Sequence, residues 1–442
     1  MKLLPKFNFS QTISIFFMFL IIFLPFGHLL WYYFLSVSGF DLPEFPYLHF
    51  YDLVIVVLSL VAFIKYLLNF NRKSFLDWRF FSICLMALGL ISIFFISPSW
   101  RQGVEGFRFT LLSIALLFSA SVFGQACDLK KMIRIYLWVA FVVALWALIE
   151  RLFPLNYWQL IIPNIENSYG TFLVGSSNIQ RSASFLLGAN QLGSYLLPTF
   201  FLSISDIIEN RSKKLPVLFS VVFFLAIFFS FSRAALLGLL LSLFIFLYVR
   251  LGQKVRRILI SFAVLLALVV TLIGLFPNNK LSQLVTHGES QIGHNQALTE
   301  TLVELKARTA HGWPIIVGGG IGTAGPIAIK YGGLIPESWY LQLVLELGIL
   351  GFVLWLVVFG LISKNLIVSK QFGLFFGLLS LMITALFLHT FADNLVLVYT
   401  MFILIGVASS QRKLIQTDKE EQPRYLSTGS RPDGNNQGTI IS

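Results

Sequence analysis

The sequence predicts an all-α, polytopic membrane protein with about 12 transmembrane helices, and its composition supports this class. Hydrophobic residues make up 57% of the chain and charged residues only 12%, and the mean hydropathy is +0.82. A soluble fold of 442 residues could not bury that much apolar surface. The net charge of +12 comes from Lys and Arg in short clusters between apolar stretches. That distribution indicates membrane topology and contact with anionic lipid, and argues against nucleic-acid binding.

The basic clusters orient the predicted helices in the membrane. By the positive-inside rule, both chain termini lie on the cytoplasmic side. The twelve predicted helices cover residues 11–35, 51–70, 79–97, 107–127, 132–152, 184–207, 217–232, 234–249, 258–276, 338–362, 371–389 and 394–410. Residues 1–410 therefore form the transmembrane domain. Residues 411–442 contain few large apolar side chains and are predicted to be a disordered cytoplasmic tail.

A single arginine interrupts the longest apolar run of the chain. Residues 217–249 are apolar or small except for Arg233, and basic residues flank the run on both sides. Because both flanks are expected on the cytoplasmic side, the run must cross the membrane twice. Each limb would then be about 24 Å long, against a hydrocarbon core of about 30 Å. The sequence therefore predicts a helical hairpin with Arg233 at its outer tip.

The long extracytoplasmic loop from 277 to 337 precedes the tenth predicted helix and contains patterned sequence. Leu298, Leu302 and Leu305 recur on one face, which predicts an amphipathic helix between 295 and 310 that lies on the membrane or caps a cavity. Five glycines follow between 318 and 325. Gly320 and Gly322 would allow the backbone to approach a ligand closely, although a flexible surface loop has the same composition. The run lacks the Gly-Lys-Ser/Thr of a nucleotide-binding loop.

Two glutamates mark the start of the tenth predicted helix. Glu337 lies at its outer end, where a carboxylate also stabilises a helix N-terminus. Glu346 lies nine residues later, about 180° around the helix, so the two cannot share one face. We interpret Glu346 as a buried structural acid bonded to a neighbouring helix, with catalysis as the alternative.

The sequence resembles the O-antigen ligase and polymerase superfamily over four motifs in a fixed order. They are RSASFLLGANQLGSYLLP from Arg181, FSFSRAALLGLL around Arg233, the glycine run, and ESWYLQLVLELGILG from Glu337. The resemblance implies a GT-C-like glycosyltransferase fold acting at the outer face of the membrane in exopolysaccharide, capsule or O-antigen synthesis. It implies a polyprenyl-pyrophosphate-linked glycan donor, a glycan acceptor, and a chain-length regulator or export complex as a partner. Ligases of this group carry a histidine where this chain has Glu337-Ser338, so the resemblance favours a polymerase.

Arginines are the residues expected to bind the donor. A guanidinium stays charged and binds phosphate oxygens in a bidentate manner, which stabilises a leaving pyrophosphate. Arg233 is the first candidate, with Arg181 and Arg308 as further members of the site. Arg233 could instead reach the membrane interface or pair with a carboxylate such as Glu150, and Arg308 could pair with Glu304 on the same helix face.

The second requirement of the chemistry is a base for the attacking hydroxyl. Glu337 and His311 are the candidates, and a partly apolar setting would raise the pKa of Glu337 toward a useful value. Trp339 and Tyr340 could stack on sugar rings. No metal site or cofactor is expected. A lipid-linked oligosaccharide flippase or another transporter remains an alternative, although no related halves with broken helices are seen in the sequence. An O-antigen ligase proper and a non-enzymatic subunit of an export complex remain open as well.

Overall fold

The computed structural model describes residues 9–38, 50–153, 157, 160, 180–209, 214–250, 288–310 and 312–426. Within these residues the chain is helical and has no β-strand, which confirms the predicted all-α class. The predicted helix at 258–276 and the candidate residue His311 lie outside the described residues.

The helices of the first half follow the predicted spans, with one exception. They are α1 (Phe9–Ser38), α2 (Phe50–Leu68), α3 (Trp78–Phe95), α4 (Trp100–Thr110), α5 (Leu112–Phe123) and α6 (Leu129–Ile149), with the 3-10 helices η1 (Arg72–Leu76), η2 (Gly124–Ala126) and η3 (Glu150–Leu152) between or after them. The exception is the predicted span 107–127, which is formed by α4 and α5 with a bend of 50° between them. Ser99 starts α4 by accepting a hydrogen bond from the N–H of Gln102 (3.2 Å).

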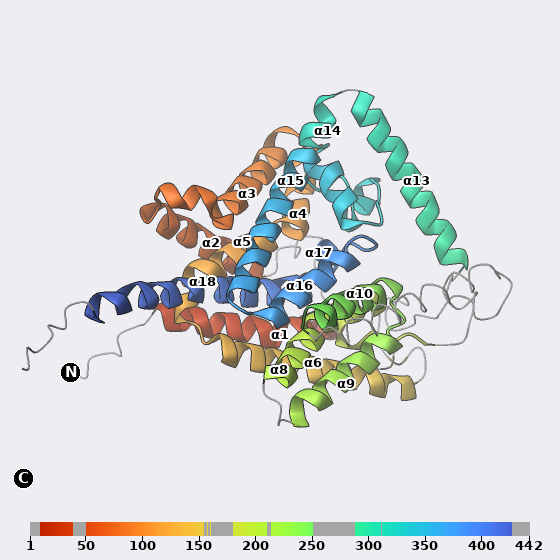
Figure 1. The fold of residues 1–442 in the computed structure, drawn as a ribbon. Helices are drawn as coiled ribbons and strands as arrows, with labels where there is room; N and C mark the ends of the chain where they lie inside the picture. Colours follow the sequence, from red (N-terminus) through yellow and green to blue (C-terminus); the bar gives the residue numbers. More distant parts are fainter. Residues whose placement is uncertain are drawn as a thin grey trace, which may run out of the picture.

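The second half contains more short helices than the sequence predicts. Its elements are η4 (Ser184–Leu186), α8 (Ala189–Glu209), α9 (Lys214–Phe229), α10 (Arg233–Arg250), α13 (Gly288–Ala310), α14 (Trp313–Val317), η5 (Pro326–Tyr331), α15 (Trp339–Val368), α16 (Phe372–Thr384), α17 (Thr390–Asp393) and α18 (Leu395–Leu426). The predicted helix at 295–310 is confirmed as part of α13, which runs along one side of the molecule and meets α14 at its C-terminal end (Figure 1). The backbone of α18 is helical to Leu426, so the first part of the predicted disordered tail continues this helix.

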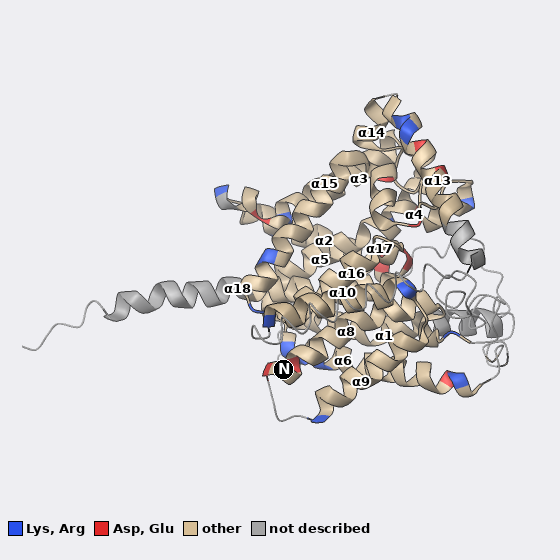
Figure 2. Ribbon diagram, turned by 45° about the vertical axis from the view of Figure 1, so that its right-hand side comes forward, with Lys and Arg blue, Asp and Glu red and all other residues tan. Residues whose placement is uncertain are grey.

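Several helices have the length and apolarity of membrane spans. Five of the described helices could cross a membrane, or six if α4 and α5 form one bent span. Figure 2 shows charged residues mainly at the helix ends and in the connections, with long uncharged helix segments between them. These features support a membrane protein. The count of twelve spans remains a prediction.

The centre of the core is α18. Every residue from Asn394 to Ser410 is buried, and Gly406 lets this helix approach α5 closely, because a Cβ there would lie 2.6 Å from that of Ala120. A buried ion pair between Arg108 of α4 and Asp52 of α2 (2.6 Å) adds a polar connection between neighbouring helices.

The predicted division of this apolar run into two helices at Arg233 is confirmed, and the position of the turn at the outer face of the membrane remains a prediction. Helix α9 ends at Phe229, the turn covers residues 230–232, and Arg233 is the first residue of α10. Phe231 in this turn has a left-handed backbone conformation (φ 49°), which lets the chain reverse within three residues.

The predicted single helix 338–362 is instead broken. Gly348 has φ 68° and ψ −173° inside α15. The ring of Tyr340 lies 5.5 Å from that of Trp355, whereas 15 residues of straight helix would separate the two by about 22 Å. Helix α15 therefore consists of two limbs that fold back on each other at Gly348, a first limb (339–347) and a second limb (349–368).

Candidate functional site

Arg181 is held by a tightly bonded segment that precedes α8. The N–H of Ser184 donates a hydrogen bond to the buried carboxylate of Glu150 at the end of α6 (2.9 Å). The N–H of Ser182 donates to the carbonyl oxygen of Phe229 at the end of α9 (3.0 Å). These contacts fix the segment between the ends of two helices, so the backbone position of Arg181 is well defined.

Glu150 is part of this scaffold rather than a counter-ion for Arg233. Its side chain is 1% exposed, and besides the N–H of Ser184 its carboxylate accepts a hydrogen bond from the hydroxyl of Tyr157 (2.5 Å). The structure therefore gives no support to the pairing of Glu150 with Arg233 that the sequence leaves open.

Arg181 and Arg233 lie close enough to influence each other electrostatically. Arg181 donates to two neutral acceptors, the carbonyl oxygen of Ser230 in the hairpin turn and Oδ1 of Asn190, both at 2.9 Å. Arg233 is solvent-exposed at the start of α10. Burial, and secondly the positive charge of Arg233, lower the pKa of Arg181 to about 10. A bound anion would relieve this repulsion between like charges.

Glu337 occupies a strained position just before the first limb of α15. Its φ of 56° is in the left-handed region, which non-glycine residues rarely adopt outside functional or tightly constrained sites. The neighbouring main chain is anchored, because the N–H of Trp339 donates to the carbonyl oxygens of Ala385 (3.1 Å) and Leu388 (3.3 Å). The surrounding structure therefore maintains the conformation of Glu337.

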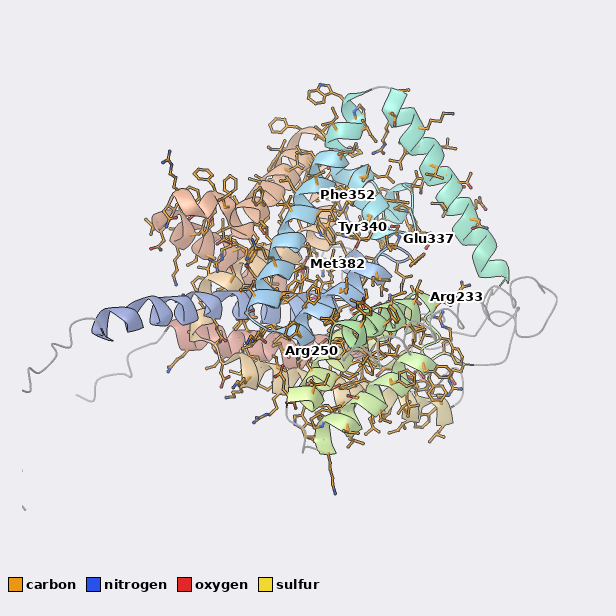
Figure 3. The ribbon with its side chains drawn as sticks, in the orientation of Figure 1. Arg233, Arg250, Glu337, Tyr340, Phe352 and Met382 are labelled. Atoms are coloured by element: carbon orange, nitrogen blue, oxygen red, sulfur yellow. The ribbon has the colours of Figure 1, made fainter. Side chains whose placement is uncertain are left out.

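The end of α16 brings the surroundings of Glu337 and Arg233 together. Thr384 donates a hydrogen bond to the carbonyl oxygen of Ala234, the residue after Arg233 (3.4 Å). The next residue, Ala385, accepts the hydrogen bonds from the start of α15. Figure 3 shows Arg233 at the N-terminal end of α10 and Glu337 above it, on the segment that leads into α15.

His389, just before α17, and Asp393, the last residue of α17, are electrostatically coupled to Glu337. Burial lowers the pKa of His389 to about 4, and the charge of Glu337 opposes this shift. Partial desolvation by the surrounding protein, and secondly the charge of Glu337, raise the pKa of Asp393. Asp393 is nevertheless exposed to solvent. Oδ2 of Asp393 accepts a hydrogen bond from Gln191 at the start of α8 (2.7 Å). Three titratable side chains thus lie within electrostatic range of each other.

A hydrogen-bond network connects His389 to the interior. Its Nδ1 lies 2.9 Å from Oε1 of Gln342, and Nε2 of Gln342 donates to Glu346 (3.4 Å). Glu346 is fully buried and also accepts hydrogen bonds from Thr110 of α4 (2.9 Å) and from the N–H of Gly322 (3.0 Å). This agrees with the interpretation of Glu346 as a buried acid bonded to a neighbouring helix.

The glycine run, which the sequence predicts to be a substrate loop, closely approaches the protein's own backbone. A Cβ on Gly320 would lie 2.6 Å from the Cα of Ser97, and one on Gly322 would lie 2.4 Å from the carbonyl oxygen of Gln102. The N–H of Gly320 also donates to the carbonyl oxygen of Glu346 (3.1 Å). The glycines therefore pack against α4 and cap the C-terminal end of the first limb of α15.

Arg308 has the same capping role. Its Nη1 donates to the carbonyl oxygen of Leu345, and its Nε pairs with Glu304 at 2.8 Å. The i,i+4 spacing of Glu304 and Arg308 indicates this ion pair, which is the alternative to binding of the donor by Arg308. Leu345 lies about 12 Å along the helix from Glu337, so Arg308 binds the opposite end of the first limb from the acidic cluster.

The two aromatic candidates differ in exposure. Trp339 is 1% exposed and packs against Trp355 and Phe391, so its ring has no face open to a sugar and belongs to the core. Tyr340 is partly buried, and its hydroxyl donates to the carbonyl oxygen of Met382 (2.7 Å) on the facing helix (Figure 3).

The structure therefore combines some predicted residues with others that the sequence analysis does not identify. Arg181, Arg233 and Glu337 lie in one region, together with His389 and Asp393. Both of the added residues occur in the short polar sequence HTFADN between two apolar helices. The polar interruption is the one signal that could have identified them.

Comparisons with known proteins do not add a family to this picture. No protein-family model matches the chain, and no curated protein matches it. In the described part of the chain, no three His, Cys, Asp or Glu side chains are placed to hold a metal ion.

Proposed function

We propose that this chain is a membrane glycosyltransferase that needs no metal ion and extends or ligates polyprenyl-pyrophosphate-linked oligosaccharides at the outer face of the cytoplasmic membrane. The observation that carries the proposal is the location of Arg181 and Arg233 beside the Glu337, His389 and Asp393 cluster. A glycosyl transfer with a pyrophosphate leaving group needs both kinds of residue at one place.

The arginine side of the cluster is suited to an anion. The first residues of α8 and α10 contribute to the site, and a helix N-terminus carries partial positive charge. Arg233 itself is a cation at a helix N-terminus, an arrangement that opposes the helix dipole and does not stabilise the helix. A guanidinium at this position can bind the phosphate oxygens of the donor in a bidentate manner.

The acidic side of the cluster is suited to the attacking hydroxyl. Glu337 takes the proton of an acceptor hydroxyl as the oxygen bonds to the anomeric carbon of the donor. The bond between that carbon and the pyrophosphate oxygen breaks, and its electron pair leaves with the pyrophosphate held by the arginines. The donor itself provides the driving force, so ATP is not required.

A lipid-linked oligosaccharide transporter is the second candidate, and the break in α15 favours it. Transporter sites commonly lie at discontinuous helices, and the described chain has such a break at Gly348 and a 50° bend between α4 and α5. Bond formation separates the two functions, because a transporter moves its substrate unchanged.

The test is to remove the gene and size the glycan that remains on the lipid carrier. Single repeat units on outward-facing carrier are the result expected for a polymerase, and long chains left on carrier would indicate a ligase. Inward-facing units would contradict a transferase and support the transporter. The same preparation of membranes, supplied with purified protein, should then recover chain growth.

A further inference from the structure

The buried histidine of the cluster has an acceptor atom that no described group uses. Nε2 of His389 is buried and has no hydrogen-bond partner, and the whole residue is 8% exposed. Buried polar atoms are nearly always paired, and an unpaired one is costly. A group that donates a hydrogen bond to Nε2 would remove this cost.

The tautomer of His389 follows from its other nitrogen. Oε1 of Gln342 lies 2.9 Å from Nδ1 and can only accept, so Nδ1 carries the proton. Gln342 is kept in this orientation because its amide nitrogen faces the carboxylate of Glu346 (3.4 Å). Nε2 is therefore the lone-pair atom. The low pKa of His389, about 4 as a result of burial, keeps it neutral at physiological pH.

Four charged or titratable groups lie in the same region as Glu337. His389 immediately precedes α17 and Asp393 is its last residue, and both are electrostatically coupled to Glu337. Arg233 is the first residue of α10, below Glu337 in Figure 3, and Arg181 is coupled to Arg233. The negative charge of Glu337 raises the pKa of Asp393. By reciprocity, the charge of Asp393 disfavours the ionised form of Glu337. The arginines act in the opposite direction until an anion neutralises them.

Resting on the proposed function, we propose that His389 is a positioning residue that makes Glu337 a stronger base. Nε2 of His389 accepts a hydrogen bond from the carboxyl group of Glu337 once Glu337 has taken the proton of the acceptor hydroxyl. This hydrogen bond stabilises the protonated form of Glu337. The buried Nε2 cannot touch the substrate directly, so His389 acts through Glu337. Asp393 assists by charge repulsion. A donor pyrophosphate bound to Arg233 and Arg181 adds to the effect, because it removes the positive charge that favours ionised Glu337.

The test is the pH dependence of chain growth by purified protein in lipid bilayers. A base must be deprotonated to act, so activity falls as the pH drops through the acid limb that Glu337 sets. His389→Asn keeps a donor toward Gln342 but lacks an atom at the Nε2 position. We expect its acid limb to move to lower pH by about 0.5 to 1 unit, the size of one hydrogen bond to the neutral acid. The plateau rate should fall about three- to tenfold, because a weaker base transfers the proton less efficiently.

Two further variants test the inference even if His389→Asn does not fold. His389→Gln places an acceptor oxygen near the Nε2 position and should return the limb toward its original place. Asp393→Asn removes only the charge and should move the limb in the same direction as His389→Asn, by a smaller amount because solvent reaches this side chain. Glu300→Gln, an exposed carboxylate on α13, is the matched control and should leave the profile unchanged.

Binding of polyprenyl pyrophosphate alone separates this role from a structural one. Its affinity should be the same in His389→Asn and in the original protein. Lower activity in the His389 and Asp393 variants with an unmoved acid limb would overturn the inference, as would a Glu337→Gln variant that keeps the original limb. If the unmodified protein transfers no glycan while still binding the carrier, the proposed function itself fails.

Discussion

Replacing Arg233 by lysine and by alanine tests the pyrophosphate site with little risk to the fold. Arg233 is exposed and is the first residue of α10, and a cation at a helix N-terminus is unfavourable by about 0.3 to 1 kcal/mol. Substitutions at exposed positions usually change stability by no more than about 0.5 kcal/mol, so the thermal midpoint and the abundance of the variants should stay close to those of the original protein.

The expected loss of activity is much larger than any change in stability. Lysine keeps the charge but loses the bidentate geometry, so one charge-assisted hydrogen bond of about 1.5 to 3 kcal/mol is lost. That corresponds to a rate about 10 to 150 times lower. Alanine removes the remaining electrostatic stabilisation as well, and loss of a preorganised group of this kind lowers turnover by about 100- to 1000-fold.

The assay is chain growth on carrier lipid in membranes that lack the chromosomal copy, with equal amounts of each variant. Arg250→Lys is the control, because Arg250 lies over the ring of Phe372 (4.2 Å) at the opposite end of α10 and is not assigned to the donor. It should keep activity within about twofold. Full activity in Arg233→Lys, or an equal loss in the Arg250 control, would refute the bidentate role of Arg233.

Three further predictions concern the scaffold. Gly348→Ala should destabilise the protein by about 2 kcal/mol or more, seen as a lower thermal midpoint, since its backbone is left-handed and a Cβ would lie 2.1 Å from the carbonyl oxygen of Ile316. An unchanged midpoint would contradict the break in α15. Arg308→Ala should lower the midpoint by loss of a cap worth about 1 kcal/mol without changing the affinity for polyprenyl pyrophosphate, and a selective loss of affinity would return Arg308 to the donor site. Because burial lowers the pKa of His389 to about 4, below its unfolded value, this residue contributes stability that is present above pH ~6.5 and lost as the pH falls through ~4. When the pH is lowered from ~7 to ~4, the free energy of unfolding should therefore fall by about 2 kcal/mol less in His389→Asn than in the original protein. An equal fall in both proteins would count against burial of His389.

The hairpin at Arg233 could be predicted because two independent constraints agree. The apolar run is too long for one span, and basic residues flank both of its ends. The length of the run and its flanking charges together allow only a helical hairpin, and neither constraint depends on the packing of other helices.

The break in α15 could not be predicted, because its cause is tertiary. A glycine inside an apolar helical pattern is tolerated in a straight helix, and Gly348 is surrounded by residues typical of a span. The break is stabilised by segments distant in sequence, including the capping N–H groups of the glycine run and Arg308. The same glycines suggested a ligand loop because close approach to a ligand and close approach to a helix need the same backbone freedom.

His389 could not be identified for a related reason. A single histidine between two apolar helices has no recognisable spacing pattern. Gln342, its hydrogen-bond partner, lies in α15, and Glu337, whose charge affects it, lies just before α15. Glu337 was identifiable because it directly follows the long outer loop. The character of the cluster as a coupled group of titratable residues appears only when α15 and α17 are placed side by side.

The most direct measurement is the reaction itself, with purified protein in proteoliposomes and a polyprenyl-pyrophosphate-linked oligosaccharide as the only substrate. Longer glycan on the carrier and release of free polyprenyl pyrophosphate are expected, with both products lost in Arg233→Ala. Movement of unchanged substrate across the bilayer without a new glycosidic bond would contradict the proposed glycosyl transfer.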